Sequence, residues 1–319
     1  MEMVIKMKTV FIDGKEWVDL SLLEPLKQYG EVEVFEGIPG SDEEAAKRAK
    51  GADVIAFGLM QISNGLIDML SDLKVLQFIG TGVNTFVDVD YAAKKGIKVL
   101  NIEGYGNMAV AEYAIACMFT LNRQIVRADN SMKAGKWTLT GLEGAEIDKS
   151  TIGVVGTGNI GAIVAKKAVS LGATVLAFDV FKSEALQKEY GVKYTELDEI
   201  FKKCDIITLH LKVNQNTTKI INERLISSMK ENAILINVGR SELVDNEALY
   251  QALVQSKIRG AAIDVYDQEP PKDARLAQLD NVIASPHIAY YTRNATDNSI
   301  AMSVDSIIKA IESDKGVDR

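Results

Sequence analysis

The chain has 319 residues, of which 47% are hydrophobic and 25% charged, and 36 Lys and Arg against 44 Asp and Glu give a formal net charge of −8. This length is sufficient for two domains with separate cores, and the composition is typical of a soluble globular protein. Because the charge balance is acidic, nucleic acid and anionic membrane surfaces are not expected as partners.

Two further features bear on location. No apolar run approaches the length of about 18 residues that suggests a membrane-spanning helix, and the N-terminal stretch MEMVIKMKTVFIDG lacks the basic and apolar regions of a signal peptide. Cys117 and Cys204 lie in apolar surroundings, outside any CxxC or metal-ligand spacing. We therefore expect a cytoplasmic protein with reduced cysteines, no metal site and no membrane partner.

The first 106 residues alternate short apolar runs with amphipathic segments. The pattern predicts strands at 9–12, 32–35, 54–57, 75–79 and 98–100, and helices at 20–29, 41–50, 64–70 and 88–95. Repeated strand and helix units indicate a parallel sheet covered on both faces.

A longer helical pattern follows at residues 108–134, through AVAEYAIACMFTLNRQIVRA. It carries much apolar surface, which could be buried between two domains or could form part of a larger contact between two copies of the chain. We favour the second interpretation and expect a homodimer.

The stretch from Thr151 to Asp179 reads TIGVVGTGNIGAIVAKKAVSLGATVLAFD and predicts a strand, a glycine turn, a helix and a second strand. Gly156 would permit the tight turn, Gly158 would let the backbone approach a pyrophosphate, and Gly161 would let the helix pack closely on the strand. The stretch is therefore typical of a dinucleotide-binding site.

The same stretch predicts which dinucleotide binds. The backbone N–H groups around Asn159 and Ile160 would face the phosphates at the positive end of the helix dipole. Asp179 lies 18 residues beyond Gly161, near the offset of about 20 at which an acidic residue receives the ribose hydroxyls. A carboxylate there would repel a 2′-phosphate, so we predict NAD rather than NADP.

Beyond this stretch the alternation continues to the end of the chain. It predicts strands at 175–178, 206–209, 233–238, 260–265 and 282–284, and helices near 160–171, 197–202, 222–227, 246–255 and 293–313. The fold class is therefore α/β with two doubly wound domains: a flavodoxin-like substrate domain of residues 1–106 plus 287–319, and an inserted Rossmann NAD-binding domain of residues 107–286. We expect hinge crossings near 103–107 and 285–290.

Three ionisable residues, Arg240, Glu269 and His287, come just after predicted strands of the second domain, where open parallel sheets bind their ligands. Of the two histidines, His210 ends a strand and fits a structural or cofactor-adjacent role. His287 can exchange a proton near neutral pH, and Glu269 is available to stabilise its protonated form.

Arg240 on a surface would ordinarily be a solvated charge. Its glycine neighbour and its position at a strand end favour a planar, bidentate binder of a carboxylate. An arginine that also contacts a carbonyl oxygen would stabilise the charge that develops there during hydride transfer. Together with His287 and Glu269, it indicates reduction of a 2-oxo acid.

These residues belong to segments through which the sequence resembles the D-2-hydroxyacid dehydrogenase family over essentially its whole length. The matching segments are GTGNIG with Asp179, NVGRSELVDNEAL with Arg240, DVYDQEP with Asp264 and Glu269, and SPHIAYYT with His287. Their occurrence in this order is far more specific than any one of them.

The resemblance implies a role for each site residue. The catalytic triad would be Arg240, Glu269 and His287, and the substrate carboxylate would bind backbone N–H groups of the loop Gly80-Thr81-Gly82-Val83. A helix that begins at Val110-Ala111-Glu112 would lie between the domains and form the dimer contact. The expected cofactor-binding residues are Gly156, Gly158, Asn159, Ile160, Gly161, Asp179, His210, Val238, Gly239 and Asp264, and the expected substrate-binding residues are Thr81, Gly82, Arg240 and His287.

The sequence departs from the family pattern at three places. Ser241 replaces the usual glycine after the catalytic arginine, which could alter the local backbone or substrate access. Lys212 replaces a proline two positions after His210, on the adenosine side. The segment 56–60 lacks the arginine of phosphoglycerate-type members, and its apolar side chains Phe57, Leu59 and Met60 suit a small unphosphorylated acid.

We therefore expect an NAD-dependent oxidoreductase that reversibly reduces a small 2-oxo acid, of the pyruvate, glyoxylate or hydroxypyruvate class, to the D-2-hydroxy acid. Two alternatives stay open: an NAD-sensing scaffold that binds partner proteins, as corepressors of this family do, and a phosphoglycerate-type dehydrogenase. Oxidation of formate is a third, less expected alternative, because His287 pairs with a glutamate.

Overall fold

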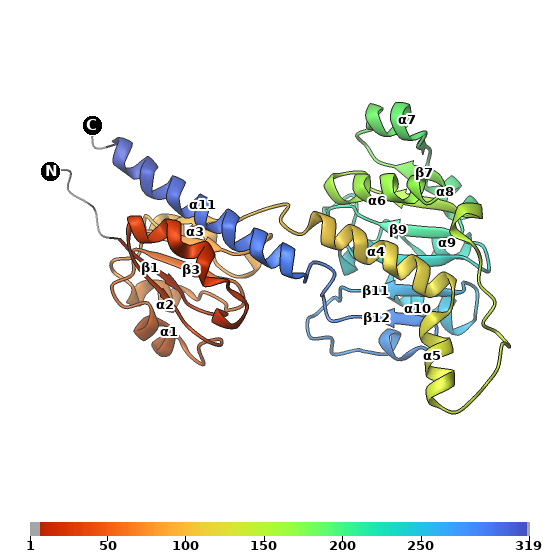
Figure 1. Ribbon diagram of the computed structural model, residues 1–319, viewed down its shortest axis with the longest axis horizontal. Helices are drawn as coiled ribbons and strands as arrows, with labels where there is room; N and C mark the ends of the chain where they lie inside the picture. The colour runs from red at the N-terminus through yellow and green to blue at the C-terminus, as the bar shows by residue number, and fades with distance from the viewer. Residues whose placement is uncertain (1–6, 318–319) are drawn as a thin grey trace. The chain divides into compact units, whose positions relative to one another are not determined.

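The computed structural model describes residues 7–317 of the chain (Figure 1). Its contacts divide the chain into two compact units, Met1–Gly106 with Thr292–Arg319, and Asn107–Tyr291. His287 falls within the second unit in this division, whereas the sequence-based boundary after residue 286 assigned it to the first. Within residues 7–317, no helix is both long enough and apolar enough to cross a membrane.

The first unit contains a parallel five-stranded sheet in the order β2-β1-β3-β4-β5. Its strands are β1 (Met7–Phe11), β2 (Gly30–Val34), β3 (Val54–Phe57), β4 (Val75–Phe78) and β5 (Lys98–Leu100). All four residues of β3 and all four of β4 are buried. Such continuous burial requires covering layers on both faces of the sheet, as the apolar runs in the sequence predicted.

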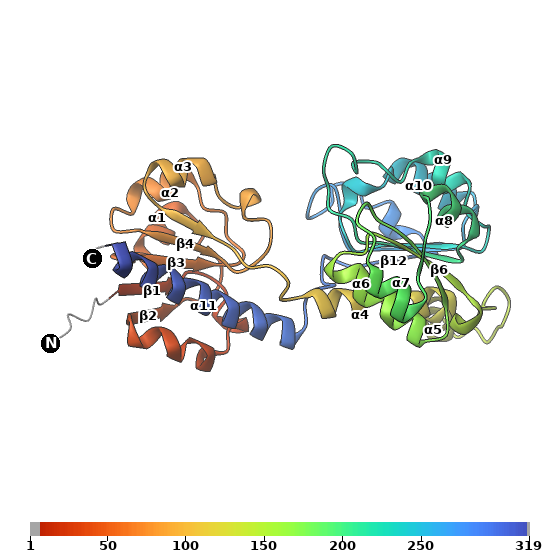
Figure 2. The same cartoon turned by 90° about the horizontal axis from the view of Figure 1, so that it is seen from above.

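The helices of the first unit supply these two layers (Figure 2). One face carries α1 (Asp42–Arg48), α2 (Asn64–Met69) and α3 (Val89–Lys94), and the other carries the 3₁₀ helix η2 (Leu20–Gln28) and α11 (Arg293–Val317). The helix that the sequence predicted at 20–29 is present as this 3₁₀ helix rather than as an α-helix. It contains Pro25, which has no N–H to donate within an α-helix.

The second unit contains a parallel seven-stranded sheet in the order β12-β11-β10-β9-β6-β7-β8. Its strands are β6 (Thr151–Val155), β7 (Thr174–Phe178), β8 (Lys193–Tyr194), β9 (Ile206–Leu209), β10 (Ile234–Asn237), β11 (Gly260–Ile263) and β12 (Val282–Ala284). The strand order reverses between β6 and β9, which is where doubly wound sheets open a crevice for ligands.

Helices cover both faces of this sheet as well (Figure 2). One face carries α4 (Asn107–Asn122), α6 (Asn159–Ser170) and α7 (Glu184–Tyr190), and the other carries α8 (Leu197–Lys203), α9 (Glu223–Ser227) and α10 (Asn246–Val254). The predicted fold class, two doubly wound α/β domains, is confirmed. The helix α7 and the short strand β8 were not predicted, although Ser183 caps the start of α7 and Gly191 ends it in a left-handed conformation.

The single helix expected over residues 108–134 is wrong. The chain forms α4 and a second helix, α5 (Ile125–Lys133), separated at Gln124, whose φ of 55° cannot continue a right-handed helix. Asn122 stabilises the break, because its side-chain amide donates to the carbonyl of Ala145 at 2.9 Å and its own carbonyl accepts from the Ala145 N–H at 3.4 Å. No glycine or proline marks this break in the sequence.

Candidate active site

The three glycines of the turn between β6 and α6 differ in what surrounds them. A Cβ atom on Gly156, whose φ is +93°, would lie 2.7 Å from the backbone of His210, and one on Gly161 would lie 1.9 Å from the carbonyl oxygen of Gly156. Both glycines are therefore required by the fold itself. A Cβ on Gly158 would meet nothing within 4 Å, so the space above Gly158 is open to a ligand.

The start of α6 faces this open space. Within residues 7–317 the N–H groups of Asn159 and Ile160 donate to no acceptor, and no side chain caps the helix. Asn159 is exposed and Ile160 half-buried. Free N–H groups at the positive end of a helix dipole are suited to a pyrophosphate.

Asp179, at the end of β7, is tied to the glycine turn. One carboxylate oxygen accepts from the Thr157 N–H at 2.6 Å and from the Thr157 hydroxyl at 3.3 Å, and the other accepts from the Phe181 N–H at 3.0 Å. The Tyr194 hydroxyl forms a hydrogen bond with the Thr157 hydroxyl at 2.8 Å and accepts another from the Ser183 N–H. These contacts hold the carboxylate at the edge of the turn and leave it lone pairs for ribose hydroxyls.

His210 closes the other side of the turn. Its N–H donates to the Val155 carbonyl at 2.7 Å, and its backbone occupies the space that a side chain on Gly156 would need. The Nε2 atom lies 2.9 Å from the Thr208 hydroxyl. His210 is half-buried as a whole residue. Desolvation of its imidazole nevertheless lowers the pKa of the ring to about 3, so the ring is neutral near pH 7. This geometry fits a structural, cofactor-adjacent residue.

Arg240, Glu269 and His287 follow β10, β11 and β12, three neighbouring strands of the same parallel sheet. Their segments therefore leave the sheet at its carboxyl edge. His287 Nδ1 lies 2.7 Å from Glu269 Oε2, and Glu269 Oε1 accepts from the Tyr266 N–H at 3.1 Å. Side-chain exposure of 37% for His287 and 40% for Glu269 leaves the pair accessible to a ligand.

The segment that carries His287 has an unusual backbone. Its φ is 55°, in the left-handed region that side chains rarely adopt. The buried carboxylate of Asp264 accepts three hydrogen bonds from this segment, from the Ser285 hydroxyl at 2.6 Å, the Ile288 N–H at 2.9 Å and the Ala289 N–H at 2.8 Å. Asp264, expected among the cofactor-binding residues, thus holds the Ser285 side chain before His287 and the backbone after it.

Arg240 lies on a turn that Asn237 organises. The buried Asn237 side chain accepts from the Gly239 N–H at 3.1 Å and donates to the Arg240 carbonyl at 2.9 Å. Val238 is buried, and a Cβ on Gly239 would come within 3.3 Å of the Leu209 carbonyl. The Arg240 guanidinium is exposed and forms no ion pair with any carboxylate of residues 7–317, so it is available to an anionic ligand.

One of the departures from the family pattern, Ser241, has a structural account. The Ser241 side chain is buried and donates to Asp267 at 2.7 Å, and Asn246 donates to both residues. The serine therefore links the Arg240 segment to the loop that carries Glu269. Lys212 is exposed, and its carbonyl accepts from the Thr217 hydroxyl.

The first unit contains the loop Gly80-Thr81-Gly82-Val83, for which the sequence predicted carboxylate binding. Gly82 has a φ of 91° and its Cβ position is empty, while Thr81 is exposed and donates to the Ile102 carbonyl at 3.1 Å. The N–H groups of Thr81, Gly82 and Val83 donate to no acceptor within residues 7–317. Successive free N–H groups beside a left-handed residue form an anion-binding concavity.

The segment 56–60 differs from the expectation drawn from its apolar residues. Phe57 and Met60 are buried in the core of the first unit, and only Leu59, at 48% exposure, can contact a ligand. The buried Asp13 carboxylate fixes the segment by accepting from the N–H groups of Gly58, Leu59 and Met60 at 2.8–2.9 Å. Phe57 and Met60 therefore cannot line a substrate pocket.

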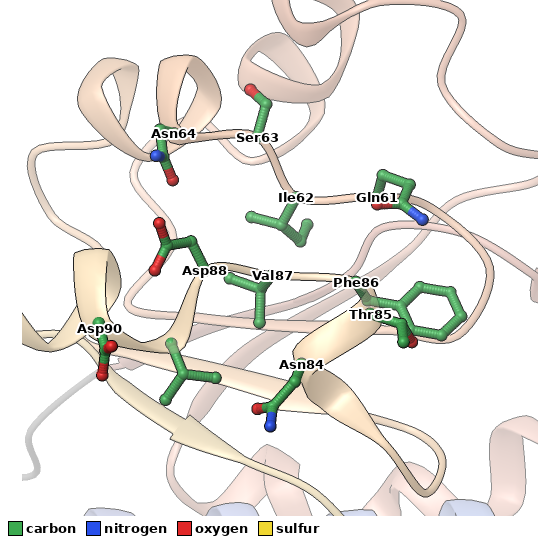
Figure 3. Close-up of a pocket in the computed structure, with 11 residues that line it drawn as sticks. Gln61, Ile62, Ser63, Asn64, Asn84, Thr85, Phe86, Val87, Asp88 and Asp90 are labelled. Carbon is green, nitrogen blue, oxygen red and sulfur yellow. The ribbon is translucent and has the colours of Figure 1, made fainter. Parts of the chain in front are cut away.

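A hollow of about 720 Å³ lies elsewhere in the first unit, lined by residues 61–64 and 84–90 (Figure 3). Two of its polar side chains serve the fold, because Ser63 caps α2 and Asp88 caps α3. It contains none of the residues that the sequence predicted for a site. Within residues 7–317, no group of three or more His, Cys, Asp or Glu could hold a metal ion.

Comparison with known proteins agrees with this geometry. Residues 115–289 match the family model described as D-isomer specific 2-hydroxyacid dehydrogenase, NAD binding domain. The chain belongs to this family. The matched residues include the glycine turn with Asp179, Arg240, Glu269 and His287, so the second unit is an NAD-binding domain, and the predicted cofactor, NAD, is confirmed.

Individual relatives span the same fold but differ in their named activities. The chain is 38% identical to a hydroxypyruvate reductase of Thermotoga maritima, covering 79% of this chain and 82% of that protein. It is 36% identical to a D-3-phosphoglycerate dehydrogenase of Methanocaldococcus jannaschii over 90% of this chain, but spans only 54% of that relative's length. Among solved structures, an apo D-lactate dehydrogenase of Escherichia coli shares 30% identity and a TM-score of 0.86, covering 96% of this chain and 98% of that one. The expected enzyme class is confirmed at the level of the family.

Several residues of the site were not predicted. Tyr113, Ser285 and Tyr266 hold the His287 segment, and Thr157 and Tyr194 hold Asp179. The position of Ser285, two residues before His287, was a usable signal. Tyr113 lies 172 residues from its partner Ser285, and nothing in the sequence connects them.

Proposed function

We propose that the chain is an NAD-dependent dehydrogenase that reversibly reduces a small unphosphorylated 2-oxo acid, of the pyruvate, glyoxylate or hydroxypyruvate class, to the D-2-hydroxy acid. The observation that carries the proposal is the 2.7 Å contact between His287 and Glu269. The segments of this pair and of Arg240 leave the same edge of the sheet. The Arg240 guanidinium donates to the Gly239 carbonyl at 2.8 Å but forms no ion pair within residues 7–317, so its other N–H groups are available to a substrate anion.

Each of these residues has one role in the proposed reaction. Glu269 accepts a hydrogen bond from the Nδ1–H group of protonated His287, and the ring donates its Nε2 proton to the substrate oxygen. Arg240 binds the substrate and stabilises the negative charge that develops on that oxygen. Bound NADH supplies the hydride to the carbonyl carbon. In the oxidative direction, His287 accepts the hydroxyl proton.

The substrate carboxylate is assigned to the free N–H groups of the Thr81 and Gly82 loop. The absence of arginine from segment 56–60 favours substrates without a phosphate, and Leu59 is the one side chain of its three apolar residues that can meet them. A difference of one methylene in an apolar pocket changes specificity by only ~1–3 kcal/mol, so several short 2-oxo acids are expected to react.

A phosphoglycerate-type activity is the second candidate, because relatives with that name match most of this chain. Steady-state NADH oxidation with glyoxylate, hydroxypyruvate, pyruvate and 3-phosphohydroxypyruvate separates the candidates. We expect the highest kcat/KM with an unphosphorylated acid. A preference for the phosphorylated acid would favour the second candidate, and no turnover of any acid would favour an NAD-sensing scaffold.

We further propose a homodimer formed through residues 108–134 and the segment that follows them. Large apolar side chains are exposed there at Met108, Phe119, Ile125, Val126, Met132, Trp137 and Leu139, with Trp137 at 88% and Leu139 at 85% exposure. Such a surface is typical of a contact with a second copy of the chain. Sedimentation should give twice the chain mass, and Trp137→Ser with Leu139→Ser should shift the observed mass towards that of the monomer.

We also propose a cytoplasmic location, which is supported by the two buried thiols that form no disulfide, Cys117 and Cys204.

A further inference from the structure

A chain of directed hydrogen bonds connects α4 to the segment that carries His287. The Tyr113 hydroxyl donates to the Ser285 hydroxyl at 2.6 Å, and the Ser285 hydroxyl donates to Asp264 Oδ1 at 2.6 Å. Because a serine hydroxyl has one proton, and Ser285 gives it to Asp264, Tyr113 must be the donor in the first bond. The chain of bonds therefore has a fixed direction that ends on a buried carboxylate.

This carboxylate fixes the backbone next to His287. Asp264 Oδ1 also accepts from the Ile288 N–H, and Oδ2 accepts from the Ala289 N–H. The Ser285 carbonyl is held as well, by the Tyr266 hydroxyl at 3.0 Å and the His287 N–H at 3.0 Å. Residues on both sides of His287 are thus anchored, which a non-glycine residue with a φ of 55° requires.

We propose that Tyr113 is a positioning residue that acts through Ser285 and Asp264 to hold the His287 backbone so that Nδ1 faces Glu269. Within residues 7–317, no hydrogen bond joins Tyr113 to His287 or Glu269. Its hydroxyl orients the Ser285 hydroxyl, which completes the set of donors on Asp264 and ties the end of β12 to the end of β11. The expected effect of Tyr113 on kcat rests on the proposed function. Its expected effect on the position of the His287 ring does not.

The test compares Tyr113→Phe with Tyr190→Phe as a matched control. Both tyrosines are half-buried and pack against the same hydrophobic core, but Tyr190 lies on α7, away from the His287 segment. Each variant loses only a hydroxyl group. We expect Tyr113→Phe to lower kcat by ~3- to 10-fold, the scale of one lost hydrogen bond, with little change in the KM for NADH. Tyr190→Phe should leave kcat unchanged.

Histidine NMR supplies a readout that does not depend on turnover. The chain contains only two histidines, so the ring signals that disappear in His210→Asn identify His210, and the remaining ring signals belong to His287. In ¹⁵N-histidine-labelled protein, we expect the His287 ring signals to shift or broaden in Tyr113→Phe and not in Tyr190→Phe. Ser285→Ala should have the same effect, and adding Tyr113→Phe to it should change the spectrum no further.

The outcomes separate the two proposals. Wild-type His287 signals and wild-type kcat in folded Tyr113→Phe would overturn the positioning role. Equal effects of Tyr113→Phe and Tyr190→Phe would also overturn it, because they would indicate general loss of packing. If no 2-oxo acid is reduced by the wild-type protein but the His287 signals change as expected, the positioning role stands and the proposed function fails.

Discussion

His287 Nδ1 lies 2.7 Å from Glu269 Oε2, across two segments that leave neighbouring strands of one sheet. The contact fixes which ring nitrogen faces the carboxylate, so the other nitrogen, Nε2, is available to a substrate. The second oxygen of Glu269 is held by the Tyr266 N–H. A histidine held in this way is suited to proton transfer.

Glu269→Gln tests the charge in this pair. Glutamine keeps the size and one acceptor oxygen but cannot stabilise a protonated imidazole by its charge. We expect kcat for 2-oxo acid reduction to fall by ~10- to 100-fold, while the Kd for NADH, measured by fluorescence titration, stays within about twofold. A variant with unchanged kcat would show that the carboxylate charge has no part in catalysis.

The glycine turn offers a matched pair of substitutions. Gly158→Ala places a methyl group in open space, so the protein should keep its melting temperature but lose at least ~10-fold in NADH affinity. Gly161→Ala places the same group 1.9 Å from the Gly156 carbonyl and should lower the melting temperature. Calorimetry and NADH titration of both variants distinguish the two roles. Unchanged NADH affinity in Gly158→Ala would contradict the assignment of this space to the cofactor.

Asp179→Ala removes the acidic residue at the end of β7. We expect the affinity for NADH to fall by ~10-fold, because the ribose hydroxyls lose a charged acceptor, and the affinity for NADPH to rise relative to it, because repulsion of the 2′-phosphate is relieved. The ratio of the two Kd values serves as the internal control. A ratio equal to that of the wild-type protein would remove Asp179 from cofactor selection.

His210 predicts a component of acid sensitivity. Its pKa is near 3 in the folded chain and near 6.5 when exposed, so between these values the unfolded state binds the additional proton. Stability is therefore unaffected by His210 above about pH 6.5 and decreases as the pH falls towards 3. Urea unfolding at several pH values should show that His210→Asn gains stability relative to the wild-type protein as the pH falls. A constant difference between the two proteins would contradict this.

The sequence identified those parts of the fold and site that depend on local pattern. Arg240, Glu269 and His287 could be placed at one sheet edge because each follows an apolar strand, and parallel strands end at the same edge. The roles of Phe57 and Met60 were misjudged, because an apolar run shows that a strand is buried but not where its last residues point. The direction of segment 56–60 after β3 is set by hydrogen bonds to the Asp13 carboxylate, 45 residues or more away along the chain.

Long-range contacts account for the rest. The break at Gln124 is stabilised by Ala145, and Tyr113 on α4 donates a hydrogen bond to Ser285, two residues before His287. Neither contact can be recognised in the hydrophobic periodicity of the sequence, because each partner fits the pattern of its own segment. Such contacts become visible only when the strands are placed in register.

The central claim, that His287 transfers the proton during reduction of a 2-oxo acid, is tested most directly by His287→Ala. NADH titration and steady-state kinetics should be measured on the same preparation, with the best 2-oxo acid of the panel. We predict an NADH Kd close to that of the wild-type protein and a kcat lower by at least ~100-fold, the usual scale for loss of a general acid. Turnover near the wild-type rate, with NADH still bound, would contradict the account.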